Sequence, residues 1–142
     1  MIKRTANAIW QGDLKNGHGK LALGSGAFEG KYSFTSRFED GQGTNPEELI
    51  GAAHAGCFSM SLSSGLTKAG YVVDEIRTEA IVSMEKGESG FGISRIKLVS
   101  YANVRDIEMD EFSKIASDAK KNCPVSKALA AVDVYLEAHL LK

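Results

Sequence analysis

The feature that most constrains the fold of this chain is an uncharged stretch, Leu49 to Thr67, in which nearly every residue is small or apolar. Just before it, Asn45 is a favourable N-cap and Pro46 suits the first helical position. Glu47 and Glu48 place carboxylates in the first turn, where the helix dipole favours them. The sequence therefore predicts a helix that begins here and, having no face suited to water, lies at the centre of the fold.

A membrane span is the competing interpretation of so long an uncharged segment. Its glycines, its histidine and its four serines make it too polar for the hydrocarbon core of a bilayer. The small residues suit close packing against a second helix instead. Lys68, Ala69 and Gly70 supply a basic last turn and a C-terminal stop, so we expect the helix to end near Lys68.

Length and charge limit the classes of protein to consider. With 142 residues, 43% hydrophobic and 25% charged, the chain is expected to form one domain over residues 1–142. The formal net charge of −1 gives no electrostatic reason to expect nucleic acid or an anionic membrane as a partner. The first ten residues lack the apolar core of a signal peptide, so we expect a cytoplasmic protein. In that compartment two cysteines point to buried thiols, metal ligands or redox chemistry.

Three strands are expected ahead of the long helix. Residues 5–10 and 20–23 form a hairpin, because an Asn-Gly turn signal lies between them. Residues 31–38 alternate, with Tyr32 and Phe34 on one face and Arg37 on the polar face, so this segment is predicted to be the third strand.

The rest of the chain predicts a second set of strands with two helices. Residues 72–85 and 91–104 alternate and are joined by a five-residue hairpin connection at 86–90. Asp110 is expected to cap a helix that closes at residues 120–122, and Pro124 to begin a short helix through Ala131. Residues 132–141 alternate as a last strand. The predicted class is an α+β fold with an antiparallel sheet.

The candidate chemistry lies at the two cysteines, which match neither a CxxC motif nor a zinc-ribbon spacing. Cys57 lies about 15 Å from the start of its helix at 1.5 Å per residue, too far to gain much from the helix dipole. A reactive Cys57 therefore needs a cation, for which Arg37 is the candidate. The alternatives are that Cys57 is a small core residue and that Arg37 is a solvated residue paired with Glu39 or Asp40.

Cys123 precedes Pro124 at a helix break, where it is expected to be the N-cap of the next helix. Free backbone N–H groups there stabilise a thiolate, whereas the C-terminal dipole of the preceding helix disfavours it. The two effects shift the pKa of Cys123 in opposite directions, so the sequence is compatible with either a lowered or a raised pKa. A metal site formed by Cys57, Cys123 and His54 is a second possibility, since His54 lies at i−3 from Cys57. The simpler interpretation of His54 is a buried histidine hydrogen-bonded to backbone.

Two runs carry a resemblance to a known family. GTNPEELIGAAHAGCFSMSLS and NCPVSKAL resemble the osmotically inducible protein C and organic hydroperoxide resistance (OsmC/Ohr) family, closest to the OsmC branch, and the resemblance covers essentially the whole chain. It implies an α+β fold in which antiparallel sheets wrap around a long central helix in an intertwined homodimer. It also implies a thiol peroxidase that acts in stress defence. One departure is Gly56, where relatives commonly have Ala.

The resemblance also implies roles for four residues. Cys57 corresponds to the cysteine that reacts with a peroxide and Cys123 to the cysteine that resolves its sulfenic acid as a disulfide. Glu47 corresponds to the glutamate that holds an activating arginine, for which the segment SRFEDG indicates Arg37. No resident cofactor is implied. An external dithiol, by family analogy a lipoyl group, is expected to reduce the disulfide.

Helix geometry adds a prediction about the dimer. Glu47 and Cys57 are ten residues apart, about 15 Å along one straight helix, so they cannot meet through one arginine in the same chain. We therefore expect the Glu47 near a given Cys57 to come from the partner subunit, with two central helices packed antiparallel about a two-fold axis. The alternative functional class is a non-catalytic stress protein, or a protein that binds a metal or a small molecule, on the same fold.

Overall fold

The computed structural model describes residues 1–141, in which the elements follow the order β-β-β-α-α-β-β-α-α-β. The chain divides into two compact units, one comprising Met1–Leu49 and the other beginning at Ile50. The boundary falls within the first turn of a long helix. No helix in residues 1–141 is both long and apolar enough to cross a membrane. The prediction of one domain over residues 1–142 stays a prediction.

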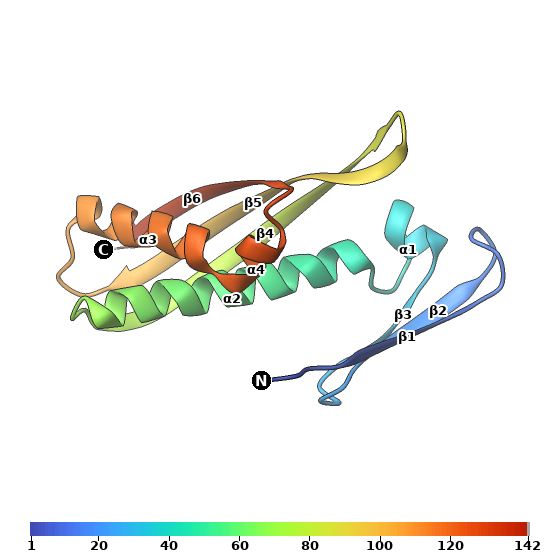
Figure 1. The fold of residues 1–142 in the computed structure, drawn as a ribbon, viewed down its shortest axis with the longest axis horizontal. Helices are drawn as coiled ribbons and strands as arrows, with labels where there is room; N and C mark the ends of the chain where they lie inside the picture. The colour runs from blue at the N-terminus through green and yellow to red at the C-terminus, as the bar shows by residue number, and fades with distance from the viewer. Residues whose placement is uncertain (142) are drawn as a thin grey trace. The chain divides into compact units, whose positions relative to one another are not determined.

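The first unit contains a three-stranded antiparallel sheet in the order β1-β2-β3 (Figure 1). Its strands are β1 (Ala6–Gln11), β2 (His18–Leu23) and β3 (Glu29–Tyr32). The predicted hairpin is confirmed, with β2 beginning two residues earlier than expected because His18 already pairs with Gln11.

The predicted third strand over residues 31–38 is wrong beyond Tyr32. The chain turns at Ser33 into a short helix, α1 (Phe34–Phe38). Ser33 is its N-cap, and a capping box with Ser36 satisfies the backbone N–H groups of both serines. Phe34 and Phe38 are four residues apart in sequence and therefore contact each other on one face of a helix. The centroids of their rings are 4.9 Å apart. Residues four apart share a face in a strand and in a helix alike, so the two phenylalanines do not distinguish the two structures.

The predicted long helix is confirmed as α2 (Pro46–Lys68). Asn45 caps it, because its Oδ1 accepts a hydrogen bond from the Glu48 backbone N–H at 2.8 Å. At the other end Gly70 adopts a φ of 94°, and the N–H groups of Gly70 and Tyr71 donate to the carbonyls of Thr67 and Leu66. This is a Schellman motif, which explains why the helix stops there.

The second unit contains another three-stranded sheet, formed by β4 (Val73–Gly87), β5 (Gly90–Val104) and β6 (Asp133–Leu141). The predicted β4–β5 hairpin is confirmed, but the strands extend to Gly87 and Gly90, so only two residues connect them. The prediction of a purely antiparallel sheet is wrong, because β6 runs parallel to β5. The helical segment between β5 and β6 returns the chain to the start of β5, which is the long crossover that a parallel pair needs.

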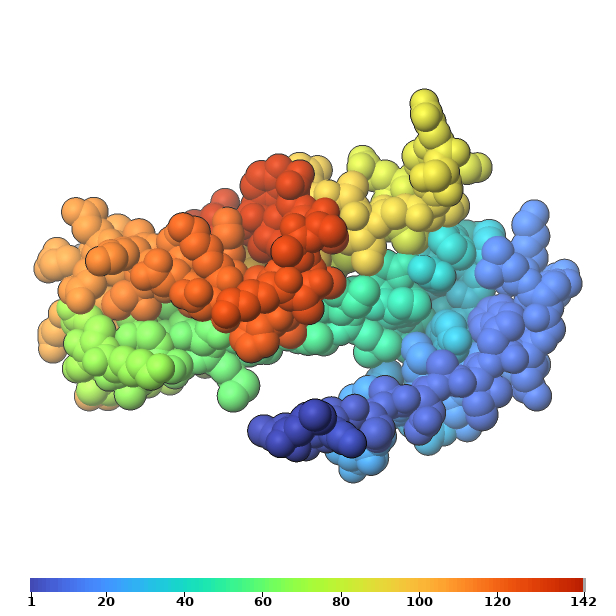
Figure 2. All heavy atoms as spheres, in the orientation of Figure 1, coloured from blue at the N-terminus to red at the C-terminus, as the bar shows by residue number. Residues whose placement is uncertain are grey.

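Two helices make that crossover, α3 (Met109–Asn122) and α4 (Pro124–Ala128). Asp110 was expected to cap α3, but the N-cap is Glu108 and Asp110 lies in the first turn. Helix α4 ends at Ala128 rather than Ala131. Figure 2 shows α3 (orange) lying against the C-terminal part of α2 (green), and a Cβ at Gly65 of α2 would come within 2.9 Å of Ile115 of α3. Glycine therefore permits this close approach.

The core of the second unit lies between its sheet and helices α2 and α3. On β5 every second residue from Ile96 to Val104 faces inward and is buried, as the alternation predicted. Helices α2 and α3 bury residues spaced three or four apart. The fully buried apolar side chains are Phe58, Leu62, Leu66, Ile96, Leu98, Ala102, Phe112 and Ala116.

Candidate active site

The two cysteines lie together in the second unit although 66 residues separate them in sequence. Cys57 projects from α2 and Cys123 lies at the junction of α3 and α4, with their Sγ atoms 2.9 Å apart. Both are free thiols; Cys123 is buried and Cys57 is partly buried. One thiol can donate a hydrogen bond to the other at this distance. A disulfide, at about 2.0 Å between sulfurs, requires a further approach of only about 1 Å.

The position of Cys123 follows from the helix break predicted at Cys123-Pro124. The Cys123 N–H donates to the carbonyl of Ala119 and closes α3, while its Sγ accepts a hydrogen bond from the Ser126 backbone N–H at 3.4 Å. Pro124, which has no N–H to satisfy, begins α4. The expectation that Cys123 caps the next helix is therefore confirmed, and its sulfur is the capping group.

The two thiols differ in their tendency to ionise. Burial raises the pKa of Cys57, and its hydrogen bond to Cys123 adds to the rise. Burial opposes ionisation of Cys123 as well. There, the hydrogen bond with Cys57 and those donated by Ser126 outweigh it and lower the pKa of Cys123. Within this unit Cys123 therefore ionises more readily than Cys57. To become the nucleophile, Cys57 requires a cation that stabilises its thiolate.

His54 is buried one turn before Cys57, and its Nε2 lies 2.7 Å from the hydroxyl of Ser126. The expectation of a backbone partner for His54 is wrong, because the partner is a side chain on α4. For the metal alternative, no three His, Cys, Asp or Glu side chains in residues 1–141 gather into a ligand set. His54, Cys57 and Cys123 do not form one.

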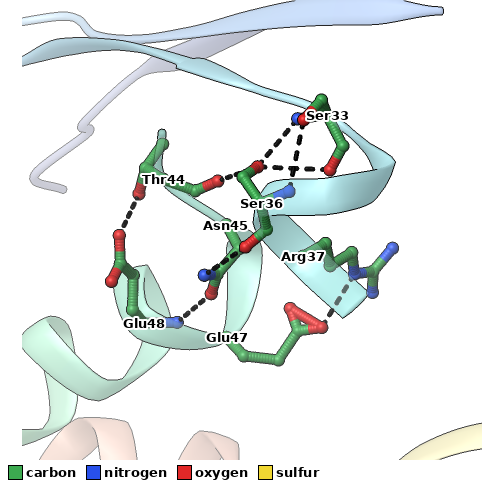
Figure 3. A network of polar contacts seen from close by, with 7 residues as sticks. All are labelled: Ser33, Ser36, Arg37, Thr44, Asn45, Glu47 and Glu48. Carbon is green, nitrogen blue, oxygen red and sulfur yellow. Dashed lines mark hydrogen bonds and ion pairs between the residues drawn. The ribbon is translucent and has the colours of Figure 1, made fainter. Parts of the chain in front are cut away.

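Arg37 and Glu47 meet in the first unit. Arg37 Nε donates to Glu47 Oε1 at 2.8 Å, as Figure 3 shows. Glu47 is only 8% exposed, whereas the Arg37 side chain is 39% exposed. Arg37 was expected on the polar face of a strand and paired, if solvated, with Glu39 or Asp40. It instead projects from α1, and its carboxylate partner is Glu47.

A network of hydrogen bonds holds α1 against the start of α2 (Figure 3). Ser36 Oγ donates to the carbonyl of Thr44 at 2.8 Å, and Asn45 Nδ2 donates to the carbonyl of Ser36 at 3.1 Å. Glu48, in the first turn of α2, accepts a hydrogen bond from Thr44 Oγ1 at 2.7 Å. The hydrogen bonds of their sequence neighbours thus fix the backbone positions of Arg37 and Glu47.

Of the four predicted site residues, Cys57 is brought to Cys123 and Arg37 to Glu47. The origin of the Glu47 that serves a given Cys57 stays a prediction. Sequence reasoning missed the contributions of Ser126 and Ser36. Ser126 could have been found as the third residue of the helix that begins at Pro124, where a backbone N–H can donate to the capping residue. Ser36 could have been found from the Ser-x-x-Ser spacing with Ser33, which is that of a capping box.

These features define a class of protein. An α+β fold that holds two free thiols in sulfur–sulfur contact, one of them the N-cap of a helix, is a dithiol protein whose cysteines are placed for disulfide chemistry. Comparison with known proteins identifies the family within this class.

The chain belongs to the OsmC-like family, whose model, described as OsmC-like protein, matches residues 39–137. It is 47% identical over 131 residues to Peroxiredoxin OsmC of Escherichia coli (strain K12), a match that covers 92% of each chain. Organic hydroperoxide resistance protein OhrB of Bacillus subtilis (strain 168) is 35% identical over 101 residues, covering 70% of this chain and 73% of OhrB. The resemblance read from the sequence is confirmed.

The fold agrees with the family. The crystal structure of OhrB from Bacillus subtilis matches with a TM-score of 0.70 and 28% sequence identity, covering 94% of this chain and 97% of that one. The predicted α+β, OsmC-like fold is therefore confirmed. The parallel strand β6 corrects the expectation that its sheets are antiparallel throughout.

Proposed function

We propose that this protein is a cysteine-based peroxidase that reduces organic hydroperoxides, and hydrogen peroxide, in oxidative and osmotic stress defence. The observation that carries the proposal is the 2.9 Å contact between the Cys57 and Cys123 sulfurs. Relatives named Peroxiredoxin OsmC and organic hydroperoxide resistance protein OhrB support it. We place the activity in the cytoplasm, where reduced thiols persist.

The reaction proceeds in two steps at the thiol pair. The Cys57 thiolate attacks the distal peroxide oxygen and the O–O bond breaks, so Cys57 becomes a sulfenic acid, and the departing alkoxide or hydroxide takes up a proton from solvent and leaves as the alcohol or water. Cys123 Sγ then attacks Cys57 Sγ. The S–S bond forms as the S–O bond breaks, and the departing hydroxide takes up the Cys123 proton as water. An external dithiol, for which we propose a lipoyl group, restores both thiols by disulfide exchange.

In this proposal Arg37 is the cation that Cys57 needs. Burial raises the pKa of Cys57, so a guanidinium beside its sulfur would favour the thiolate and hydrogen-bond the peroxide. The ion pair with the nearly buried Glu47 restrains the guanidinium of Arg37. No resident cofactor takes part.

We also propose that the working form is a homodimer in which the partner subunit supplies the Glu47 near each Cys57. The support is the exposed side of α2, which has no charged residue between Leu49 and Thr67 and exposes small and apolar residues to solvent. These residues include Ala52, Ala53, Gly56, Met60 and Ser64. An uncharged helix face of this kind favours burial against a second copy.

The test is peroxide consumption by the pure protein with a dithiol, using an alkyl hydroperoxide and hydrogen peroxide in parallel. Cys57→Ser should abolish turnover. Cys123→Ser should react once and leave a sulfenic acid on Cys57 that a carbon nucleophile traps. Arg37→Gln should slow the reaction with peroxide by about 100-fold, the usual effect of removing one preorganised donor.

Lack of turnover in the wild type, with both thiols inert to every peroxide, would refute the peroxidase proposal. It would favour the alternative of a non-catalytic stress or binding protein, for which Cys57→Ser leaves function intact. Metal content of the purified protein tests the metal-binding form of that alternative.

A further inference from the structure

The hydrogen bond between His54 and Ser126 joins α2 to α4 beside the thiol pair. His54 Nε2 and Ser126 Oγ are 2.7 Å apart, although 72 residues separate them in sequence. His54 is 0% exposed, although histidine is less often fully buried than apolar residues are. The reaction steps described above make no use of this buried side chain.

The protonation state of His54 follows from its surroundings. Burial lowers the pKa of His54, so the ring is neutral and carries one N–H. Nδ1 is buried, and no group in residues 1–141 is its hydrogen-bond partner. A buried N–H without a partner is rarer than a buried acceptor without one. The proton therefore resides on Nε2, which donates to Ser126 Oγ and leaves the Ser126 hydroxyl hydrogen for another acceptor.

Ser126 also contacts the resolving cysteine. The Ser126 backbone N–H lies 3.4 Å from Cys123 Sγ, and hydrogen bonding from both the backbone and the side chain of Ser126 favours the Cys123 thiolate. Ser126 thus lies between the buried histidine and the resolving sulfur. The contacts form one chain, from His54 through Ser126 and Cys123 to Cys57.

We propose that His54 is a positioning residue for disulfide formation: through Ser126 it holds Cys123 Sγ against Cys57 and orients the hydroxyl donor that stabilises the attacking sulfur. This inference rests on the proposed function and concerns its second step, in which Cys57–SOH and Cys123–SH give the disulfide and water. Attack on the peroxide uses Cys57, with Arg37 as its proposed cation, and does not involve Cys123. Loss of the His54–Ser126 bond is therefore expected to slow the second step and spare the first.

The experiment separates the two steps in a single turnover with one equivalent of an alkyl hydroperoxide. Sulfenic acid and disulfide are quantified by mass spectrometry after rapid quenching. In His54→Leu and Ser126→Ala, disulfide formation should be about fivefold slower, the effect of one hydrogen bond, with sulfenic acid formed at the wild-type rate. His54→Gln, whose amide N–H can donate to Ser126 Oγ, should restore most of the rate, which a merely structural role for the ring would not require.

The double variant His54→Leu/Ser126→Ala should be no slower than the slower single variant, because both changes remove the same link. Ser59→Ala is the matched control. It removes a 2.8 Å hydrogen bond from α2 to Thr78 of β4 that does not involve the thiols, and disulfide formation should keep its wild-type rate. If His54→Leu does not fold, Ser126→Ala, which keeps the backbone donor to Cys123, provides the comparison.

Wild-type disulfide rates in both His54→Leu and Ser126→Ala, or equal slowing of both chemical steps, would overturn the inference. A parallel arm distinguishes this failure from failure of the proposed function. An aromatic disulfide reagent first forms a mixed disulfide on Cys57, and Cys123 then displaces the aromatic thiolate. The same variants should slow this displacement about fivefold even if the wild type does not react with peroxide.

Discussion

At the scale of single residues, Cys57 and Cys123 show that two identical side chains in contact can differ in acidity. Cys57 is partly buried and has a raised pKa, whereas Cys123 accepts hydrogen bonds at the start of α4 and has a lowered pKa. The acidity of each thiol is a property of the pair, because each is the hydrogen-bond partner of the other.

This coupling gives a testable pH dependence. Cys57→Ala removes a hydrogen-bond donor to Cys123, so the pKa of Cys123 should rise, and less thiolate should be present at any pH near that value. Cys57→Ser retains a hydroxyl donor and should keep the pKa of Cys123 closer to its wild-type value. The ultraviolet absorbance of the thiolate, followed against pH, measures both. Identical titrations of Cys123 in the two variants would show that Cys57 does not stabilise the Cys123 thiolate.

At the scale of elements, α1 and the start of α2 show how short-range hydrogen bonds replace a strand by a helix. Residues 31–38 alternate in polarity, yet Ser33 and Ser36 form a capping box and the two phenylalanines pack four residues apart. The helix changes where Arg37 projects and allows its Nε to reach Glu47. Local capping chemistry therefore decides the placement of a proposed catalytic side chain.

Asn45 links these two helices, since its Oδ1 caps α2 and its Nδ2 donates to the carbonyl of Ser36. Asn45→Ala should lower the free energy of unfolding by about 1 kcal/mol, the usual cost of losing an N-cap. Asn45→Asp keeps the capping acceptor but loses the donor to Ser36, so its destabilisation should be smaller. Urea denaturation measures both. As a control, Ser113→Ala on the exposed side of α3 should leave stability nearly unchanged.

At the scale of the whole molecule, the proposed homodimer explains why α2 combines a buried apolar side with an exposed side that has no charge. Phe58, Leu62 and Leu66 are fully buried in the core of the second unit, whereas Met60 is 77% exposed. A side chain this apolar and this exposed gains free energy when a second copy covers it.

Met60→Glu should therefore weaken the dimer, because association would bury a carboxylate without a partner. Analytical ultracentrifugation over a range of protein concentrations should show dissociation of the variant where the wild type remains dimeric. Lys114→Glu, a charge change at an exposed position of α3, is the matched control and should leave the association unchanged. A wild type that sediments as a monomer at every concentration would refute the proposed dimer, and with it the partner origin of Glu47.

The sequence alone determined the features that depend on neighbouring residues. These are the long helix with its Asn45 cap and its stop at Gly70, the two hairpins, and the break at Cys123-Pro124. The two motifs also identified the family and both cysteines. Each of these features is encoded within a few residues, where capping, turn chemistry and periodicity act.

The tertiary structure decided what depends on residues far apart in the chain. Only the path of the crossover makes β6 parallel to β5, and only the packing of α4 beside α2 brings Cys123 to Cys57 and Ser126 to His54. Contacts between distant residues leave no local pattern, because they arise when whole elements bury their apolar faces together. The chemistry proposed for this protein depends on those contacts, although each participating side chain is visible in the sequence.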